Sequence, residues 1–317
     1  MMSIHTILQA WDRFWFSEVS PLSVAVYRIL LGFIAGAFVL LLIPDLFVWF
    51  GSRGMCSNQA VADWNNGHAV FLNLFSFFPD NDQFVVVFHC LFFFAAMALM
   101  LGFHARAAAT ICYLCLTSYY HRNPFIFNAG DTYMRVSMFW LIFSASGNAL
   151  ALTGRQQRSN TASNPENSFN NYKKVSIWPL RLLQIQLATV YWHTFFCKIV
   201  GGPWIDGSAV FTASRIEDLQ RLPLPYVFEH AWTVNFLTWS TLGIEGALFT
   251  LIWIKEFRYW VIAIAVIFHL TIEYHMNIPL FEWLMIVSYV LFIEPEHLAF
   301  ALTWLRKKLT RQKAVSL

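Results

Sequence analysis

The residues best placed to do chemistry lie at the end of one apolar segment, in the run YWHTFFCKIVGGPWIDG from Tyr191 to Gly207. This run contains one amine, Lys198. An amine held away from water loses part of the solvation that favours its cation, so it can act as a base near neutral pH. A lysine at the end of an apolar helix can equally anchor that helix at a membrane surface. Taken alone, Lys198 is therefore either a base or an anchor.

Other ionisable side chains fall inside apolar segments, where they are costly and mark functional sites by default. A helical rise of about 1.5 Å per residue places most of them in the outer half of a bilayer, which predicts a polar cavity open to the extracytoplasmic side. Arg28, near the inner end of its segment, is expected to snorkel to the cytoplasmic surface. The predicted cavity residues that accompany Lys198 are Asp131, Arg135, Tyr191, His193, Trp204, Glu245, His269 and Glu273.

Structural roles compete with this interpretation at several positions. Asp131 and Arg135 are spaced i,i+4 and could pair on one helix face. Glu245 and His269 lie at similar predicted depths and could form a hydrogen bond between helices. No metal site is predicted, because the histidines show no HExxH or similar spacing.

The elements that must position these side chains are membrane helices. The chain has 317 residues, of which 58% are hydrophobic and 12% charged, whereas soluble domains average about 25% charged residues. No basic stripe or motif indicates nucleic-acid binding. Eight apolar segments have about the length that spans a bilayer, which predicts an all-α, polytopic helical bundle. They are residues 22–43, 84–102, 104–120, 130–150, 177–199, 236–254, 258–275 and 280–302.

Basic residues between these segments predict the orientation. They gather in the alternate loops that would be cytoplasmic if both termini are cytoplasmic, as the positive-inside rule requires. Residues 1–20 are expected to form an amphipathic helix in the membrane surface. Residues 21–302 then form the transmembrane domain, with a flexible cytoplasmic linker at 151–176, and residues 303–317 form a basic cytoplasmic tail.

Four runs occur in an order that resembles a known family. They are PLSVAVYRILLG (21–32), HRNPFIFNAGDTYMR (121–135), LLQIQLATVYWHTFFCKIVGGPWIDGSAV (182–210) and FHLTIEYHMNIPLFEWLMIVSYVLFIEP (268–295). In this order they resemble the HTTM (horizontally transferred transmembrane) domain. That domain is shared by vitamin K-dependent γ-carboxylases and bacterial proteins that mature sporulation-delaying toxins.

The strongest element of the resemblance is the spacing of Tyr191, Lys198, Trp204 and Gly207. It implies that Lys198 inherits the role of the base that deprotonates a hydroquinone in the carboxylases. The carboxylases carry two adjacent lysines at this point, where this chain has Cys197 and Lys198. They also carry a large lumenal domain that has no counterpart here, so the resemblance is closer to the short bacterial proteins.

Two functional hypotheses follow. In the first, a bacterial inner-membrane protein modifies or matures an exported or membrane-associated peptide, with a quinol as reductant and Lys198 as base. In the second, the protein is a non-enzymatic scaffold, chaperone or immunity-like factor that binds an exported peptide or lipid, and Lys198 is an anchor. The sequence leaves open whether the protein is an enzyme. The lipid bilayer is the partner common to both hypotheses.

Overall fold

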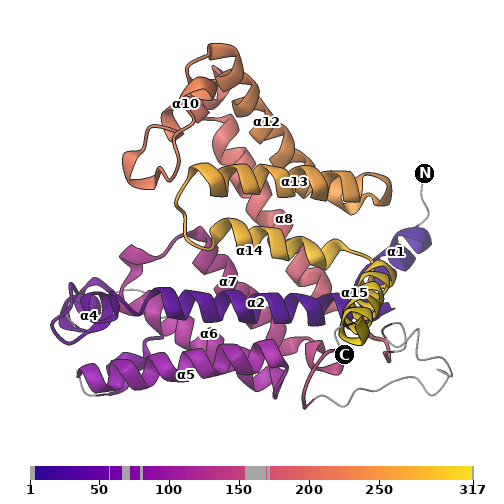
Figure 1. The fold of residues 1–317 in the computed structure, drawn as a ribbon, viewed down its shortest axis with the longest axis horizontal. Helices are drawn as coiled ribbons and strands as arrows, with labels where there is room; N and C mark the ends of the chain where they lie inside the picture. The colour runs from indigo at the N-terminus through magenta and orange to yellow at the C-terminus, as the bar shows by residue number, and fades with distance from the viewer. Residues whose placement is uncertain are drawn as a thin grey trace. The chain divides into compact units, whose positions relative to one another are not determined.

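The computed structural model describes residues 4–56, 58–65, 72–78, 81–153, 169 and 172–315 (Figure 1). The described chain is mostly helical and forms two compact units. The first unit comprises residues 1–181 and 294–317, and the second comprises residues 182–293. Most of the predicted linker 151–176 lies outside the described residues.

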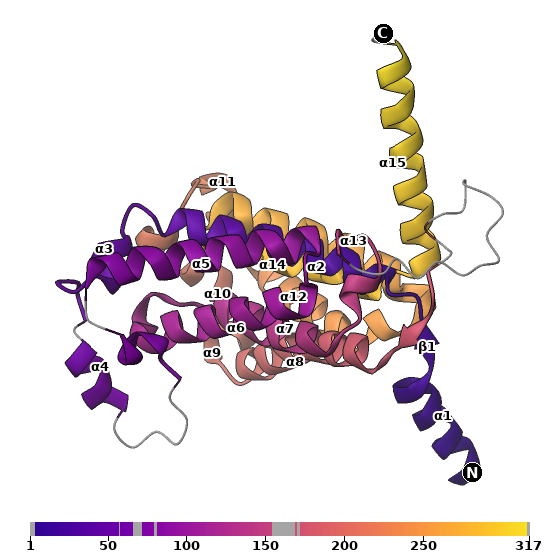
Figure 2. The same cartoon turned by 90° about the horizontal axis from the view of Figure 1, so that it is seen from below.

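Four long helices form the body of the first unit. Helix α2 packs against α5, α5 against α6, and α6 against α7 (Figure 1; Figure 2). Their bounds are α2 Leu22–Leu41, α5 Asp82–Leu101, α6 Ala105–Arg122 and α7 Ala129–Phe143, with shorter helices α1 Ile4–Phe16, α3 Leu46–Phe50 and α4 Asn58–Asn65. The long helices coincide with the first four predicted apolar segments.

Local capping explains where these helices begin and end. The Asn81 side chain accepts a hydrogen bond from the backbone N–H of Phe84 (2.8 Å) and so starts α5. Gly102 ends α5 in the left-handed conformation, with φ +71°. Asn128 and Asp131 form a capping box at the start of α7. Asp131, a predicted cavity residue, therefore has a structural task in the first turn of its helix.

Arg28 does not snorkel to a surface, so that prediction is wrong. Its side chain is fully buried, and its guanidinium donates to the carbonyls of Leu99 (2.6 Å), Met100 (3.2 Å) and Leu150 (2.6 Å). Two of these carbonyls belong to the last turn of α5, which helical hydrogen bonds leave without donors. Arg28 thus has its hydrogen-bond partners inside the unit, because the free carbonyls at the end of α5 accept hydrogen bonds that water would otherwise accept.

The first unit also contains one short pair of strands, within an otherwise helical protein. Strand β1 (Glu18–Val19) pairs antiparallel with β2 (Val175–Ser176). Helix α15 (Pro295–Val315) contacts α2, and Ala299 joins a buried cluster with Leu22 and Ala25. The predicted basic tail therefore continues a helix that packs on the unit at its first turns.

The second unit is built from the remaining long helices. Helix α13 contacts both α12 and α14, and α12 contacts α10. The bounds are α8 Trp178–Ile199, α9 Gly202–Ile205, α10 Ala209–Ala213, α11 Pro225–Phe228, α12 Ala231–Phe249, α13 Lys255–His275 and α14 Phe281–Ser288. The first four residues of α8 belong to the first unit, and the rest of the helix belongs to the second.

Among the described helices, α2, α5 and α13 are long and apolar enough to cross a bilayer by themselves. The predicted segment 280–302 is not one helix. Helix α14 passes into a 3₁₀ turn (Tyr289–Phe292), Ile293 is extended, and α15 begins at Pro295. Proline lacks the N–H that a continuous helix needs and biases the preceding residue away from helical geometry, but it is well suited to a first helical position.

Replacing Gly102 by alanine is expected to destabilise the first unit. An alanine in the left-handed conformation costs about 1–2 kcal/mol. Its Cβ would also lie 2.5 Å from the Cβ of Ala151 and 2.5 Å from the Arg28 guanidinium. Thermal unfolding of the purified protein in detergent measures the loss.

Gly243→Ala is the matched control, because a Cβ there meets no heavy atom within 4 Å. That position is inside α12, where alanine is favoured over glycine by about 0.5–1 kcal/mol. Equal stability of the Gly102→Ala and Gly243→Ala variants would contradict the role given to Gly102.

Candidate functional site

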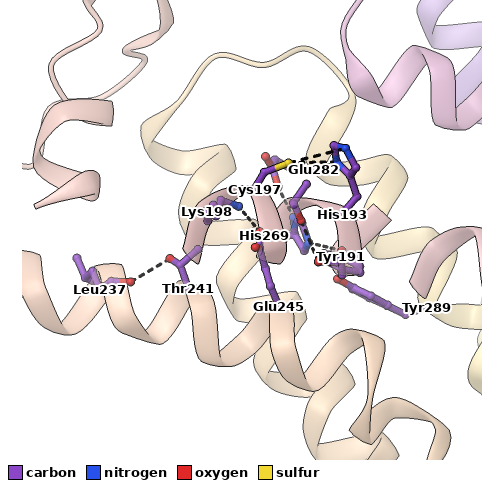
Figure 3. Close-up of polar contacts among 11 residues, drawn as sticks. Tyr191, His193, Cys197, Lys198, Leu237, Thr241, Glu245, His269, Glu282 and Tyr289 are labelled. Atoms are coloured by element: carbon purple, nitrogen blue, oxygen red, sulfur yellow. Dashed lines mark hydrogen bonds and ion pairs between the residues drawn. The ribbon is translucent and has the colours of Figure 1, made fainter. Parts of the chain in front are cut away.

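An ion pair between Lys198 and Glu245 lies within the second unit (Figure 3). The Lys198 ammonium, near the end of α8, donates a hydrogen bond to Glu245 Oε1 on α12. The Lys198 side chain is 23% exposed, whereas that of Glu245 is 6% exposed. The pair therefore joins a nearly buried carboxylate to an amine that other molecules can still reach.

The short turn after α8 places an aromatic ring beside the amine. The Lys198 Nζ lies 5.1 Å from the ring centroid of Trp204, on α9, which is within the range of a cation–π contact. Gly207 has φ +85°, and a Cβ there would lie 2.7 Å from the Asn235 side chain. Only glycine satisfies both the conformation and the close approach, which accounts physically for the glycine in this motif.

Asp206, in the same turn, is held by its neighbour Ser208. The backbone N–H of Ser208 (2.9 Å) and its hydroxyl (2.6 Å) both donate to Asp206 Oδ1. These hydrogen bonds stabilise the charged form and lower the pKa of Asp206. The carboxylate thus organises the turn that carries Trp204 and Gly207.

A second polar chain is fully buried in the same unit and links four side chains. His269 Nδ1, on α13, is hydrogen-bonded to Glu282 on α14. The Tyr191 hydroxyl, on α8, lies 2.8 Å from His269 Nε2 and 2.6 Å from the hydroxyl of Tyr289 (Figure 3). The His269 and Glu282 side chains are 3% and 1% exposed. This chain therefore connects three helices and a 3₁₀ turn through groups that can all exchange protons.

The ion pair and the buried chain each contain one carboxylate oxygen without a hydrogen-bond partner in the described part of the protein. Among the described residues, the buried atoms Glu245 Oε2 and Glu282 Oε1 have no hydrogen-bond partner at normal distance, and the Thr194 side chain interacts with the Glu245 carboxylate more weakly. Buried polar atoms are nearly always paired with protein or water. Each of these two oxygens can therefore accept a hydrogen bond from a water or a bound molecule, or receive a proton.

Glu273 and His193, both predicted cavity residues, have other contacts. Glu273 Oε1 accepts from Arg221 Nη1 (2.6 Å), so this carboxylate ties a loop to α13. The His193 side chain is exposed, and both its ring nitrogens lie 3.8 Å from the Cys197 sulfur.

The remaining two predicted cavity residues belong to the first unit. Asp131 accepts from the backbone N–H of Asn128 (2.8 Å), as part of the capping box. The Arg135 guanidinium lies 4.2 Å from the ring centroid of Tyr120. The i,i+4 neighbours Asp131 and Arg135 therefore each contact a different group.

The sequence interpretation missed two members of the buried chain, Glu282 and Tyr289. Glu282 lies inside the predicted segment 280–302, so the rule that an ionisable residue in an apolar segment is a functional suspect applies to it as well. Tyr289 carried no such signal, because a tyrosine in an apolar run is ordinary. Glu245 and His269 could have formed a hydrogen bond with each other, but they pair with Lys198 and Glu282, respectively.

No group of three or more histidine, cysteine, aspartate or glutamate side chains gathers in a metal-binding arrangement within the described part of the chain. The titratable groups of the second unit are instead arranged in pairs and chains. Groups arranged in this way can exchange protons and form hydrogen bonds with a bound molecule.

Long apolar helices that hold ionisable groups in internal pairs define an integral membrane protein. The HTTM domain family model matches residues 16–297, and the chain belongs to that family.

One protein that the chain resembles is uncharacterized protein YitO of Bacillus subtilis (strain 168). It is 24% identical over 140 residues, which are 42% of this chain and 44% of YitO. The match thus spans less than half of either protein. No solved structure matches this chain.

Removing one partner of the Lys198–Glu245 pair is expected to lower the free energy of unfolding more than removing both partners. Glu245→Leu leaves an uncompensated ammonium and should lower the free energy of unfolding by about 3 kcal/mol. This value is at the lower end of the range for buried pairs, because the Lys198 side chain is partly exposed. The double variant Lys198→Met/Glu245→Leu should return to within about 1 kcal/mol of wild type. Denaturant unfolding in detergent micelles measures both variants.

The Arg221–Glu273 pair is the matched comparison, because the Arg221 side chain is 38% exposed. Its coupling energy in the same double-mutant cycle should be below about 1 kcal/mol. Similar coupling in the two pairs would contradict the burial assigned to Glu245.

Proposed function

We propose that this chain crosses a bacterial inner membrane about eight times, with both termini in the cytoplasm. The described helices lie at the eight apolar segments, with α14 and the start of α15 at the last one, and this supports the count. Of these helices, α2, α5 and α13 are long and apolar enough to cross by themselves, and α14 with α15 would make a fourth span if they are one bent span. The distribution of basic residues between segments supports the orientation. Helix α1 exposes Ile4, Leu8 and Trp11, which suits it to the membrane surface.

We further propose that the protein modifies or matures an exported or membrane-associated peptide in a quinol-dependent reaction with Lys198 as the base. The observation that carries this proposal is the contact of a partly exposed amine with a nearly buried carboxylate. Membership of the HTTM family supports it, because Lys198 stands at the position that the resemblance assigns to a base.

Lys198 can act as a base only after its ammonium has lost a proton, and Glu245 is the acceptor in contact with it. In apolar surroundings two opposite charges are expensive to hold, and transfer of one proton converts the pair into a neutral amine and a neutral carboxyl. The amine can then take a proton from a substrate hydroxyl. Glu245 therefore determines when Lys198 is free to react.

A quinol fits the residues around Lys198 in two respects. The Trp204 ring offers an aromatic surface beside the amine, and Glu245 Oε2 is an acceptor without a partner among the described residues. Bound there, a quinol would supply the electrons of the reaction. The chain's own contribution is to hold the ring against Trp204 and to remove a hydroxyl proton with Lys198.

The non-enzymatic hypothesis is favoured by one aspect of the same pair. An ammonium that donates to a carboxylate and contacts an aromatic ring is also well stabilised as a permanent cation. In that case Lys198 and Glu245 hold α8 against α12, and the unit is a binding scaffold or chaperone for an exported peptide or lipid.

Replacing Lys198 discriminates between these functions. The full chain in lipid nanodiscs is supplied with a short-chain naphthoquinol in air, and quinol loss is followed by mass spectrometry. A base contributes about 10²–10⁴-fold to proton transfer, so Lys198→Ala should slow the reaction by about 100-fold or more. Lys198→Arg should be equally slow, because a guanidinium keeps its charge but does not deprotonate.

Cys197→Ser, at the exposed neighbouring position, is the control and should leave the rate unchanged. Wild-type loss of quinol no faster than in empty nanodiscs would remove the quinol from the proposal. Full activity of Lys198→Arg would assign Lys198 to the anchor role.

A further inference from the structure

The hydrogen bonds of the buried chain in the second unit all run one way when Glu282 is ionised and His269 is neutral. An ionised carboxylate only accepts, so Glu282 receives the proton of His269 Nδ1. In the neutral imidazole, Nε2 is then an acceptor and receives the hydroxyl proton of Tyr191 (2.8 Å). The Tyr191 oxygen in turn receives the hydroxyl proton of Tyr289 (2.6 Å). Every donor in the chain therefore points toward Glu282.

The Lys198–Glu245 pair lies in the same unit as this chain, and both are drawn in Figure 3. Glu245 is close enough to interact electrostatically with both His269 and Tyr289. Its Oε2 atom has no hydrogen-bond partner among the described residues. At the other end of the chain, Glu282 Oε1 is likewise buried and unpaired among them. Glu282 thus ends the chain on one side, and Glu245 lies within electrostatic range of Tyr289 on the other. Each carboxylate has one oxygen without a hydrogen-bond partner among the described residues.

We propose that Tyr289, Tyr191 and His269 form a proton path that carries a proton from Glu245 to Glu282. This inference rests on the proposed function, because it names the route by which the proton accepted by Lys198 and Glu245 leaves them. The path regenerates Lys198 as a free amine without returning the proton to the substrate. Glu282 is the terminal acceptor.

The transfer balances without any oxidant or co-reactant. The Glu245 carboxyl gives its proton to the Tyr289 oxygen while Tyr289 gives its own to Tyr191. Tyr191 gives its proton to His269 Nε2, and His269 Nδ1 gives its proton to Glu282. Each step breaks one O–H or N–H bond and forms another, so one carboxyl becomes a carboxylate and one carboxylate becomes a carboxyl.

The titratable groups around His269 come from four different elements of the second unit. They are Tyr191 from α8, Tyr289 from the 3₁₀ turn, Glu282 from α14 and, through longer-range interaction, Glu245 from α12. A merely structural network of these residues would keep its protons in place. A proton path differs because Glu282 gains a proton, and because the rate of that gain depends on the hydroxyls between the two carboxylates.

Infrared spectroscopy of the full chain in lipid nanodiscs tests the path without substrate or quinol. After a rapid downward pH jump, the carbonyl band of a newly protonated carboxyl is followed with time. We expect a band that is absent in Glu282→Gln and that shifts in heavy water. Its appearance should slow by about 100-fold in Tyr289→Phe and in Glu245→Gln, because each removes one proton-carrying group.

His269→Gln extends the test with a side chain that keeps hydrogen-bonding groups but does not relay a proton, and it should be slow as well. The matched controls in the same unit are Glu273→Gln and His275→Gln, which should leave the rate unchanged. His275 lies on the same helix as His269, but its Nδ1 is bonded to the Leu222 carbonyl (2.8 Å). Unfolding temperatures verify that each variant is folded.

A carboxyl band that survives Glu282→Gln would overturn the assignment of the terminal acceptor. Wild-type rates in Tyr289→Phe would overturn the path. Either failure leaves the role of Lys198 as a base untouched. Conversely, loss of the base role in the naphthoquinol assay, with a normal Glu282 band, would reject the proposed function and keep the path.

Discussion

The structure depends on one constraint, which is that an ionisable group in an apolar helical protein must have a partner inside the protein. Moving an unpaired charge out of water costs several kcal/mol even after relaxation, and water is scarce between apolar helices. Each buried ionisable side chain therefore dictates what its neighbours can be. The partner of a buried ionisable group determines whether that group keeps one protonation state or can still exchange its proton.

The two units meet this constraint differently. In the first unit, the buried guanidiniums of Arg28 and Arg122 donate to backbone carbonyls. Neither a guanidinium nor a carbonyl changes its protonation state, so these contacts hold helices and loops in place. In the second unit, Lys198 pairs with Glu245 and His269 pairs with Glu282. All four of these side chains carry exchangeable protons, and this gives the second unit a capacity for proton chemistry.

The sequence predicted the helices better than the contacts between them. Apolar length located the helices, because burying backbone in a membrane leaves few alternatives to a helix. It did not locate the break before Pro295, since hydropathy averaged over a whole segment hides the short polar interruption formed by Glu294, Pro295 and Glu296. Depth along each helix placed Glu245 and His269 at a similar level, but depth says nothing about rotation. The rotation of α12 and α13 gave each of them a different partner.

The partner of Lys198 bears on whether this lysine is a base or an anchor. An anchor needs only a charged end near the headgroups, and any carboxylate nearby would be incidental. In this protein the partner is a nearly buried glutamate that has a second, unpaired oxygen among the described residues. A carboxylate of that kind is expensive to bury for anchoring alone, because an exposed lysine can snorkel without one. Burying this carboxylate is understandable if Glu245 accepts the proton of Lys198. Glu245 is therefore as informative about the function as the lysine itself.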